Sequence, residues 1–239
     1  MYRDLDIEAL AFDVFGTVVD WRSSVSRQVS DAMSHIGVPV DTDLFADRWR
    51  EGYHSGMARI NAGEEEWKIV DRIHRERLDF LLEDLGVSAR LEEEEKTHLN
   101  RAWERLDPWR DSVAGLTRMK TRFVIAALSN GNVALLTRMA KHAGLPWDCV
   151  LSSELAGCYK PDVRVYIKAA DLLGLSRDRV MMVAAHVEDL NGAQAAGLRT
   201  AFVARPEEFG PDGSADADRH AGSDMVATDF NDLADQLGC

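Results

Sequence analysis

The sequence predicts an α/β protein with a doubly wound parallel sheet and a second, helical domain inserted after the first strand. Near the N-terminus, the short apolar run at 8–14 has the composition of a buried strand. It is followed by about 80 residues with helical periodicity and no convincing strand. From residue 107 onward, short apolar runs alternate with helical segments, which favours strands packed side by side in parallel. The length of 239 residues fits one such core carrying an insertion.

The inserted part is expected to contain four helices, because its apolar residues recur at intervals of three and four. In the first of them, Val25, Val29 and Met33 fall on one face. Breaks that begin with glycine, at 37–39 and 86–88, separate neighbouring helices. The expected helices span 23–36, 44–60, 65–85 and 91–106.

After the inserted part, five apolar runs have the length of buried strands. These expected strands span 123–128, 149–153, 180–185, 200–204 and 225–228. The helices expected in the same region span 112–120, 132–143, 162–173 and 189–196. The sequence therefore predicts a core made of 1–20 and 107–239, with a helical domain made of 21–106.

Composition restricts the possible partners and the compartment. The formal net charge is −13 and the isoelectric point is about 5.0, so the surface as a whole repels nucleic acid and anionic membrane. A small anionic substrate would need a local cationic pocket. Three cysteines without paired spacing suit a reducing cytoplasm, and we expect a cytoplasmic protein. The N-terminus has no apolar signal-peptide region, and no apolar stretch approaches the roughly 20 residues that span a bilayer.

Polar residues follow several of the predicted strands at the point where each strand ends. Asp13 ends the first strand, 129–131 (Ser-Asn-Gly) follows the second, and 186–189 follows the run at 180–185. Lys160 follows the run at 149–153 by a loop. Because ligands of open α/β sheets bind beyond the carboxyl ends of the strands, these groups are expected to converge on one site.

Four segments then carry a resemblance to a known family. The sequences DVFGT at 13–17, LSNGN at 128–132, YKPDVRVY at 159–166 and VAAHVEDLNGAQAAG at 183–197 resemble the signature segments of the haloacid dehalogenase superfamily. They occur in the family's order and spacing. The resemblance implies a Rossmann-like core, and the helical insertion is similar to the cap domain that this superfamily places after its first motif.

Two departures from the superfamily's phosphatases narrow the resemblance. Phosphatases of the superfamily carry a second aspartate two residues after the first, which protonates the leaving oxygen; here that position is Phe15. Their fourth segment has a magnesium-binding aspartate where this chain has Ala185, and only Asp189 remains. A halide leaves as a stable anion and needs neither group. The chain therefore resembles the L-2-haloacid dehalogenases, which hydrolyse (S)-2-haloacids to (R)-2-hydroxyacids through an ester of the first aspartate.

The resemblance implies a set of roles in the core. Asp13 would be the nucleophile, and Thr17 would orient it by a hydrogen bond. Lys160 would add positive charge, and Asp189 would hold Lys160 or help to activate the hydrolytic water. Tyr166 would line the site, although simple core packing is the alternative.

The remaining roles concern the substrate and the departing halide. Arg50 resembles the cap arginine that receives the halide, with Arg48 as the alternative two residues away, and Asn130 would share this task. Ser129 would bind the substrate carboxylate. His186 stands where the family commonly has an amide, so it could donate to the halide, position water or be a structural replacement. The residues expected to contact substrate are Val14, Phe15, Trp21, Arg50, Ser129 and Asn130.

The resemblance implies no metal and no other cofactor, and its partners would be a small 2-haloacid, a halide ion and a second copy of the chain in a homodimer. Two alternatives remain open at this point. A phosphatase or phosphonate hydrolase would depend on magnesium. A binding module without catalysis would have no need of the nucleophile Asp13, and turnover of a haloacetate separates it from an enzyme.

Overall fold

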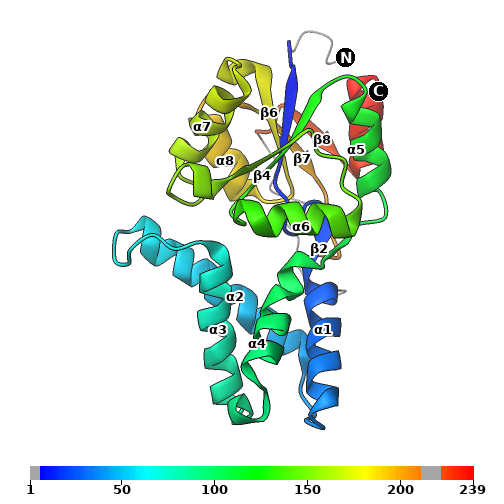
Figure 1. Cartoon of the computed structure of the whole chain (residues 1–239). Helices are drawn as coiled ribbons and strands as arrows, with labels where there is room; N and C mark the ends of the chain where they lie inside the picture. Colours follow the sequence, from blue (N-terminus) through cyan, green and yellow to red (C-terminus); the bar gives the residue numbers. More distant parts are fainter. Residues whose placement is uncertain (1–5, 211–221) are drawn as a thin grey trace.

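The computed structural model describes residues 6–210 and 222–239, and within them the core is a six-stranded parallel sheet (Figure 1). The strand order is β5-β4-β1-β6-β7-β8. The strands are β1 (Ala9–Phe12), β4 (Val124–Ser129), β5 (Cys149–Ser152), β6 (Val180–Ala184), β7 (Arg199–Val203) and β8 (Met225–Ala227). Each predicted strand is present within a few residues of its expected bounds, and the predicted fold class is confirmed.

Helices cover both faces of this sheet (Figure 1). They are α5 (Ser112–Lys120), α6 (Val133–Ala143), α7 (Val163–Leu173), α8 (Val187–Ala195) and α9 (Phe230–Leu237). Because strand side chains alternate between faces, Leu10 and Phe12 of β1 pack in one apolar cluster with Phe230. Ala9 and Ala11 pack in the other, which contains residues of α7 and α8. Helix α9 was not predicted; it has eight residues, and the Asp229 side chain caps its N-terminus.

The insertion lies between two very short strands, β2 (Val19–Asp20) and β3 (Asp107–Pro108), which pair antiparallel where the chain leaves and re-enters the core. Its helices are α1 (Trp21–His35), α2 (Thr42–Asn61), α3 (Val70–Asp84) and α4 (Glu93–Asn100), followed by the 3₁₀ turn η2 (Arg101–Glu104). Figure 1 shows them as a separate bundle below the carboxyl edge of the sheet. Further 3₁₀ turns are η1 (Ser88–Arg90), η3 (Ser153–Leu155) and η4 (Arg177–Arg179).

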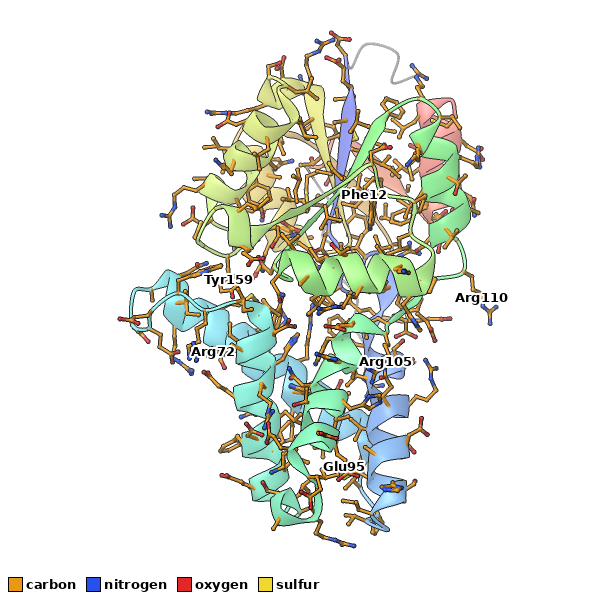
Figure 2. All side chains as sticks on the ribbon, viewed as in Figure 1. Phe12, Arg72, Glu95, Arg105, Arg110 and Tyr159 are labelled. Carbon is orange, nitrogen blue, oxygen red and sulfur yellow. The ribbon has the colours of Figure 1, made fainter. Side chains whose placement is uncertain are left out.

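Two of the expected helices differ from the structure by more than two residues. Helix α3 begins at Val70 and not at residue 65, because the preceding segment is held against the core. There Trp67 packs on the ring of Tyr159 at 4.6 Å, and the Tyr159 hydroxyl donates to the Lys68 carbonyl oxygen. Figure 2 labels Tyr159 at this junction of core and insertion. The expected helix at 91–106 is divided into α4 and η2, since the chain turns to bury Trp103.

The position of β1 in the sheet determines where a site can form. Its neighbours are β4 on one side and β6 on the other, so the chain order reverses at β1. This reversal opens a crevice beyond the carboxyl end of β1, which is where the helical insertion lies (Figure 1). No helix among residues 6–210 and 222–239 is long and apolar enough to cross a membrane.

Candidate active site

The first group of the site is Asp13, the residue that follows β1. It is 7% exposed. Its Oδ1 accepts a hydrogen bond from Lys160 Nζ at 2.9 Å, and its Oδ2 accepts one from Thr17 Oγ1 at 2.8 Å. Gly16, with φ of +84°, makes the tight turn that brings Thr17 back beside the carboxylate. The strand end therefore presents one carboxylate in a fixed orientation.

Lys160, from the loop before α7, joins Asp13 to a second carboxylate. Its Nζ also donates to Asp189 Oδ2 at 2.5 Å and to the Leu128 carbonyl oxygen at 2.8 Å. All three ammonium hydrogens thus have acceptors. The Tyr166 hydroxyl donates to the other oxygen of Asp189. Asp189 and Tyr166 consequently hold Lys160 against Asp13.

Charge pairing determines the ionisation of these groups. Burial alone would raise the pKa of Asp13, but the Lys160 ammonium and a hydrogen bond from His186 outweigh it and hold the pKa well below its usual range. Burial would lower the pKa of Lys160, yet Asp13 and Asp189 raise it. Asp13 is therefore a carboxylate, and Lys160 an ammonium, throughout the neutral pH range.

No group of three or more His, Cys, Asp or Glu side chains that could hold a metal ion occurs in the described part of the chain.

His186 lies between two carboxylates. Its Nδ1 is 3.0 Å from Asp13 Oδ2, and its Nε2 is 2.9 Å from Glu208 Oε2. Burial would lower the pKa of His186, but Glu208 and Asp13 raise it to about 10, so the ring is an imidazolium at neutral pH. Both nitrogens then donate to carboxylates. The predicted hydrogen bond from His186 to a halide is therefore not available in this geometry, because no ring N–H is left for it.

Glu208 belongs to the loop after β7 and is 3% exposed. A bidentate ion pair between Arg205 and Asp111, at 2.8 and 2.9 Å, fixes the start of this loop. The Glu208 carboxylate also accepts from Trp21 Nε1 at 3.0 Å. It lies so close to Gly16 that a Cβ there would be 2.0 Å from Glu208 Oε1. Glycine at this position is thus needed both for the turn and for the approach of Glu208.

Arg50 enters the site from α2, on the helical insertion. It is 8% exposed, and its guanidinium carbon lies 5.4 Å from the ring centre of Phe15, 5.2 Å from that of Trp21 and 4.8 Å from that of Tyr53. Ring faces attract a cation and partly offset its loss of water. Arg50 forms no salt bridge within the described residues, and its Nη1 lacks a hydrogen-bond partner there. Arg48 instead pairs with Asp84 at the surface, at 2.7 Å.

These groups surround one cavity of about 340 Å³ between the core edge and α2. Of the predicted residues, those that line it are Asp13, Phe15, Arg50, Asn130, Lys160, His186 and Asp189. The other predicted residues are buried but do not line the cavity: Val14, Thr17, Trp21, Ser129 and Tyr166. Residues that line the cavity without having been predicted include Tyr53, His54, Met57, Asn61 and Glu188.

Two predicted residues have partners that bear on their roles. The Ser129 side chain is fully buried, and its Oγ accepts from the Gly131 amide at 3.3 Å. Its direct contact with a substrate carboxylate therefore stays a prediction. Asn130 Oδ1 accepts from the Lys160 amide at 2.8 Å and from Ser153 Oγ at 2.6 Å. Asn130 thus holds the backbone of Lys160 in place.

Glu208 is the functional candidate that the sequence did not reveal. It lies outside the four motif segments. One signal was present: its loop follows the strand β7, so its side chains also emerge at the carboxyl edge of the sheet. Asp13 and His186 were identified because they follow strands at the carboxyl edge of the sheet, and the same argument applies to the carboxylates after β7.

A buried carboxylate at the end of β1, with a lysine beside it and a helical insertion above it, is the arrangement expected of one class of hydrolase. The model of the haloacid dehalogenase-like hydrolases matches residues 7–197, and the chain belongs to this family. Within it, the chain is 30% identical to (S)-2-haloacid dehalogenase 1 of Pseudomonas sp. (strain CBS-3), over 85% of this chain and 88% of that protein. It is 29% identical to (S)-2-haloacid dehalogenase 4A of Burkholderia cepacia, over 86% and 88% of the two chains.

Two solved structures of L-2-haloacid dehalogenases are more similar to this chain than these two relatives are. The crystal structure of the defluorinating L-2-haloacid dehalogenase Rha0230 is 45% identical with a TM-score of 0.95, covering 98% of this chain and 96% of that one. The L-2-haloacid dehalogenase PA0810 is 43% identical with a TM-score of 0.91, covering 97% and 99%. The resemblance predicted from the four sequence segments is confirmed.

Proposed function

We propose that this protein hydrolyses the carbon–halogen bond of short (S)-2-haloacids and releases halide and an (R)-2-hydroxyacid. The observation that carries the proposal is the charge arrangement of the cavity. A deprotonated Asp13 lines it together with Arg50, a cation that forms no salt bridge within the described residues. Phe15 stands where a proton-donating acid would be required for an oxygen leaving group. The similarity to (S)-2-haloacid dehalogenases supports the same reaction.

The first step is displacement at C2. The Asp13 carboxylate attacks C2 from the side opposite the halogen, a new C–O bond forms, and the C–X bond breaks with its electron pair leaving on the halide. This in-line attack inverts the configuration at C2. Negative charge moves from the carboxylate to the halide, and the Arg50 guanidinium stabilises it there. No proton is transferred in this step.

The second step is hydrolysis of the ester at the Asp13 carbonyl carbon. His186 is the group placed to activate the water, because its Nδ1 lies 3.0 Å from Asp13 Oδ2. Once Asp13 is an ester it has no negative charge, so one of the two carboxylates that raise the pKa of His186 is lost. The imidazolium then releases its proton to solvent, and the neutral ring accepts one from the water that attacks the Asp13 carbonyl carbon, while Glu208 holds the other nitrogen. As the acyl C–O bond breaks, the second proton of that water passes to the oxygen of the leaving 2-hydroxyacid, which restores the Asp13 carboxylate and the imidazolium. Asp189 is fully engaged by Lys160 and Tyr166, so we assign it to holding Lys160.

The same proposal covers the organisation of the chain. Residues 21–106 would act as a cap over the core formed by 1–20 and 107–239, since α2 supplies Arg50 to a cavity whose other charged groups come from the core. We further propose a homodimer, as the family resemblance implies. Three cysteines without disulfides support a reducing, cytoplasmic setting.

The test is halide release from chloroacetate, bromoacetate and the two enantiomers of 2-chloropropionate, with a chelator present. We expect release from the haloacetates and from the (S) enantiomer alone, with the (R)-hydroxyacid as product. Hydrolysis of phosphate esters without any halide release would place the protein with the phosphatases of its family. Binding of haloacids without turnover would make it a binding module.

A further inference from the structure

The amide of Asn130 is partly occupied by the protein. Its Nδ2 donates one hydrogen to the Lys160 carbonyl oxygen at 3.3 Å. Its Oδ1 accepts from the Lys160 amide and from Ser153 Oγ. Asn130 can therefore offer a departing halide at most one hydrogen, and a further donor beside it would strengthen the halide site.

The position of Tyr53 makes it such a further donor. It lies three residues after Arg50 on α2, so both side chains project from the same face of the helix. Both line the same cavity, and the Tyr53 ring centre is 4.8 Å from the Arg50 guanidinium carbon. Tyr53 is only 2% exposed, and its ring is further held by Phe15 at 6.2 Å between ring centres. The phenol therefore has little freedom to move.

The hydroxyl of Tyr53 has a hydrogen to donate. No backbone or side-chain acceptor for that hydrogen is found in residues 6–210 and 222–239. Burial raises the pKa of Tyr53, and this keeps the phenol protonated at neutral pH.

We propose that the Tyr53 hydroxyl donates to the departing halide beside Arg50, and that this pair adapts the site to fluoride. The inference rests on the proposed dehalogenase function and specifies its substrate class as 2-fluoroacids. As Asp13 forms its bond to C2, the C–F bond breaks and its electron pair leaves on fluoride. The phenol keeps its proton and only donates a hydrogen bond. Fluoride is the poorest leaving group and the strongest hydrogen-bond acceptor of the halides, so an added O–H donor lowers its barrier most.

The test is the ratio of fluoroacetate to bromoacetate turnover in wild type and in Tyr53→Phe. The variant keeps the ring beside Arg50 and removes only the hydroxyl. We expect fluoroacetate turnover to fall by on the order of 10²-fold, the usual cost of losing one such donor. Bromoacetate turnover should fall much less, so that the ratio drops at least about tenfold. Bromide release by the variant also shows that it folds.

Tyr159→Phe is the matched control, since the Tyr159 hydroxyl donates to the Lys68 carbonyl oxygen and does not line the cavity. Its ratio should equal that of wild type. A monofluorinated tyrosine at position 53, with a more acidic phenol and nearly the same shape, should raise the ratio. Equal losses on both substrates in Tyr53→Phe, or a wild type that releases bromide but no fluoride, would overturn the inference. A wild type that releases no bromide would instead overturn the proposed function.

Discussion

The two walls of the cavity differ in how their charges are paired. On the core wall, Lys160 contacts Asp13 and Asp189, and His186 contacts Asp13 and Glu208. On the helical wall, Arg50 contacts the faces of aromatic rings and forms no salt bridge with a described residue.

The difference assigns separate tasks to the two walls. A paired network holds its members in one geometry, so the core wall holds Asp13, the proposed nucleophile, in its orientation before substrate arrives. A buried cation without a carboxylate is costly to the folded protein, and the cost is recovered when negative charge appears beside it. The core wall thus fits the group that attacks, and the helical wall fits the anion that leaves.

The largest effect should come from removing the charge at the centre of the core wall. In Asp13→Asn an amide replaces the carboxylate and cannot form the ester, so halide release should fall on the order of 10⁴-fold or more. The isosteric amide should leave the fold intact, which circular dichroism can verify. A single turnover of wild type in heavy-oxygen water should place the label in Asp13. Label found directly in the hydroxyacid would exclude the covalent route.

The next largest effect should come from the helical wall. Arg50→Ala removes the charge proposed to stabilise the leaving halide, and halide release should fall on the order of 10²-fold or more. Arg50→Lys should restore only part of it, because a lysine ammonium lacks the planar donors of the guanidinium. Arg48→Ala is the matched control, since Arg48 pairs with Asp84 at the surface. Near-normal turnover in Arg50→Ala with an inactive Arg48→Ala would reverse the assignment.

A third test separates the two steps of the reaction. Glu208→Gln keeps the shape of the side chain but removes the carboxylate that holds His186 Nε2 and makes the ring a stronger base. We expect the displacement step to continue and ester hydrolysis to slow by about 10²-fold, within the range of general base catalysis. The ester of Asp13 should then accumulate, which mass spectrometry of the intact protein detects. Slower displacement without accumulated ester would show that Glu208 acts on the nucleophile and not on water.

The sequence predicted the core wall better than the helical wall for a physical reason. Groups at the ends of parallel strands must meet at one edge, so Asp13 and Lys160 follow from strand order alone. The choice between Arg50 and Arg48 depended on which face of α2 each arginine occupies. Trp49 and Tyr53 are buried on the inner face of α2, which Arg50 shares and Arg48 does not.

Glu208 shows where such reasoning ends. Glu207 and Glu208 are adjacent, and nothing in their own sequence distinguishes them. The carboxylate that turns inward is selected by Arg205, which pairs with Asp111 and donates to the Thr17 carbonyl oxygen. These partners lie 94 and 188 residues away in the chain. Contacts of that range are properties of the folded structure and not of a local pattern.

A fourth, smaller effect concerns stability and pH. The folded-state pKa of His186 is about 10, above the value near 6.5 of an unfolded chain. Its ion pairs therefore stabilise the fold fully below about pH 6.5, and this stabilisation is lost as the pH rises through about 10. The free energy of unfolding of wild type, measured in urea, should decline across this window by on the order of 1 kcal/mol or more relative to His186→Asn. Parallel pH profiles for the two proteins would contradict the pairing.

The smallest expected effect is that of a chelator. Lys160 Nζ lies 2.9 Å from Asp13 Oδ1 and 2.5 Å from Asp189 Oδ2, so an ammonium bridges the two carboxylates that a hard cation would otherwise join. Ala185 stands where the resemblance to phosphatases would require a further carboxylate. We therefore expect halide release to be unchanged by EDTA and by added magnesium.

Lys160→Met tests the same reasoning by removing the ammonium. Its loss should abolish turnover, and magnesium should not restore it, because Phe15 and Ala185 provide no ligands. Recovery of halide release with magnesium would show that the core wall binds a metal in place of the lysine.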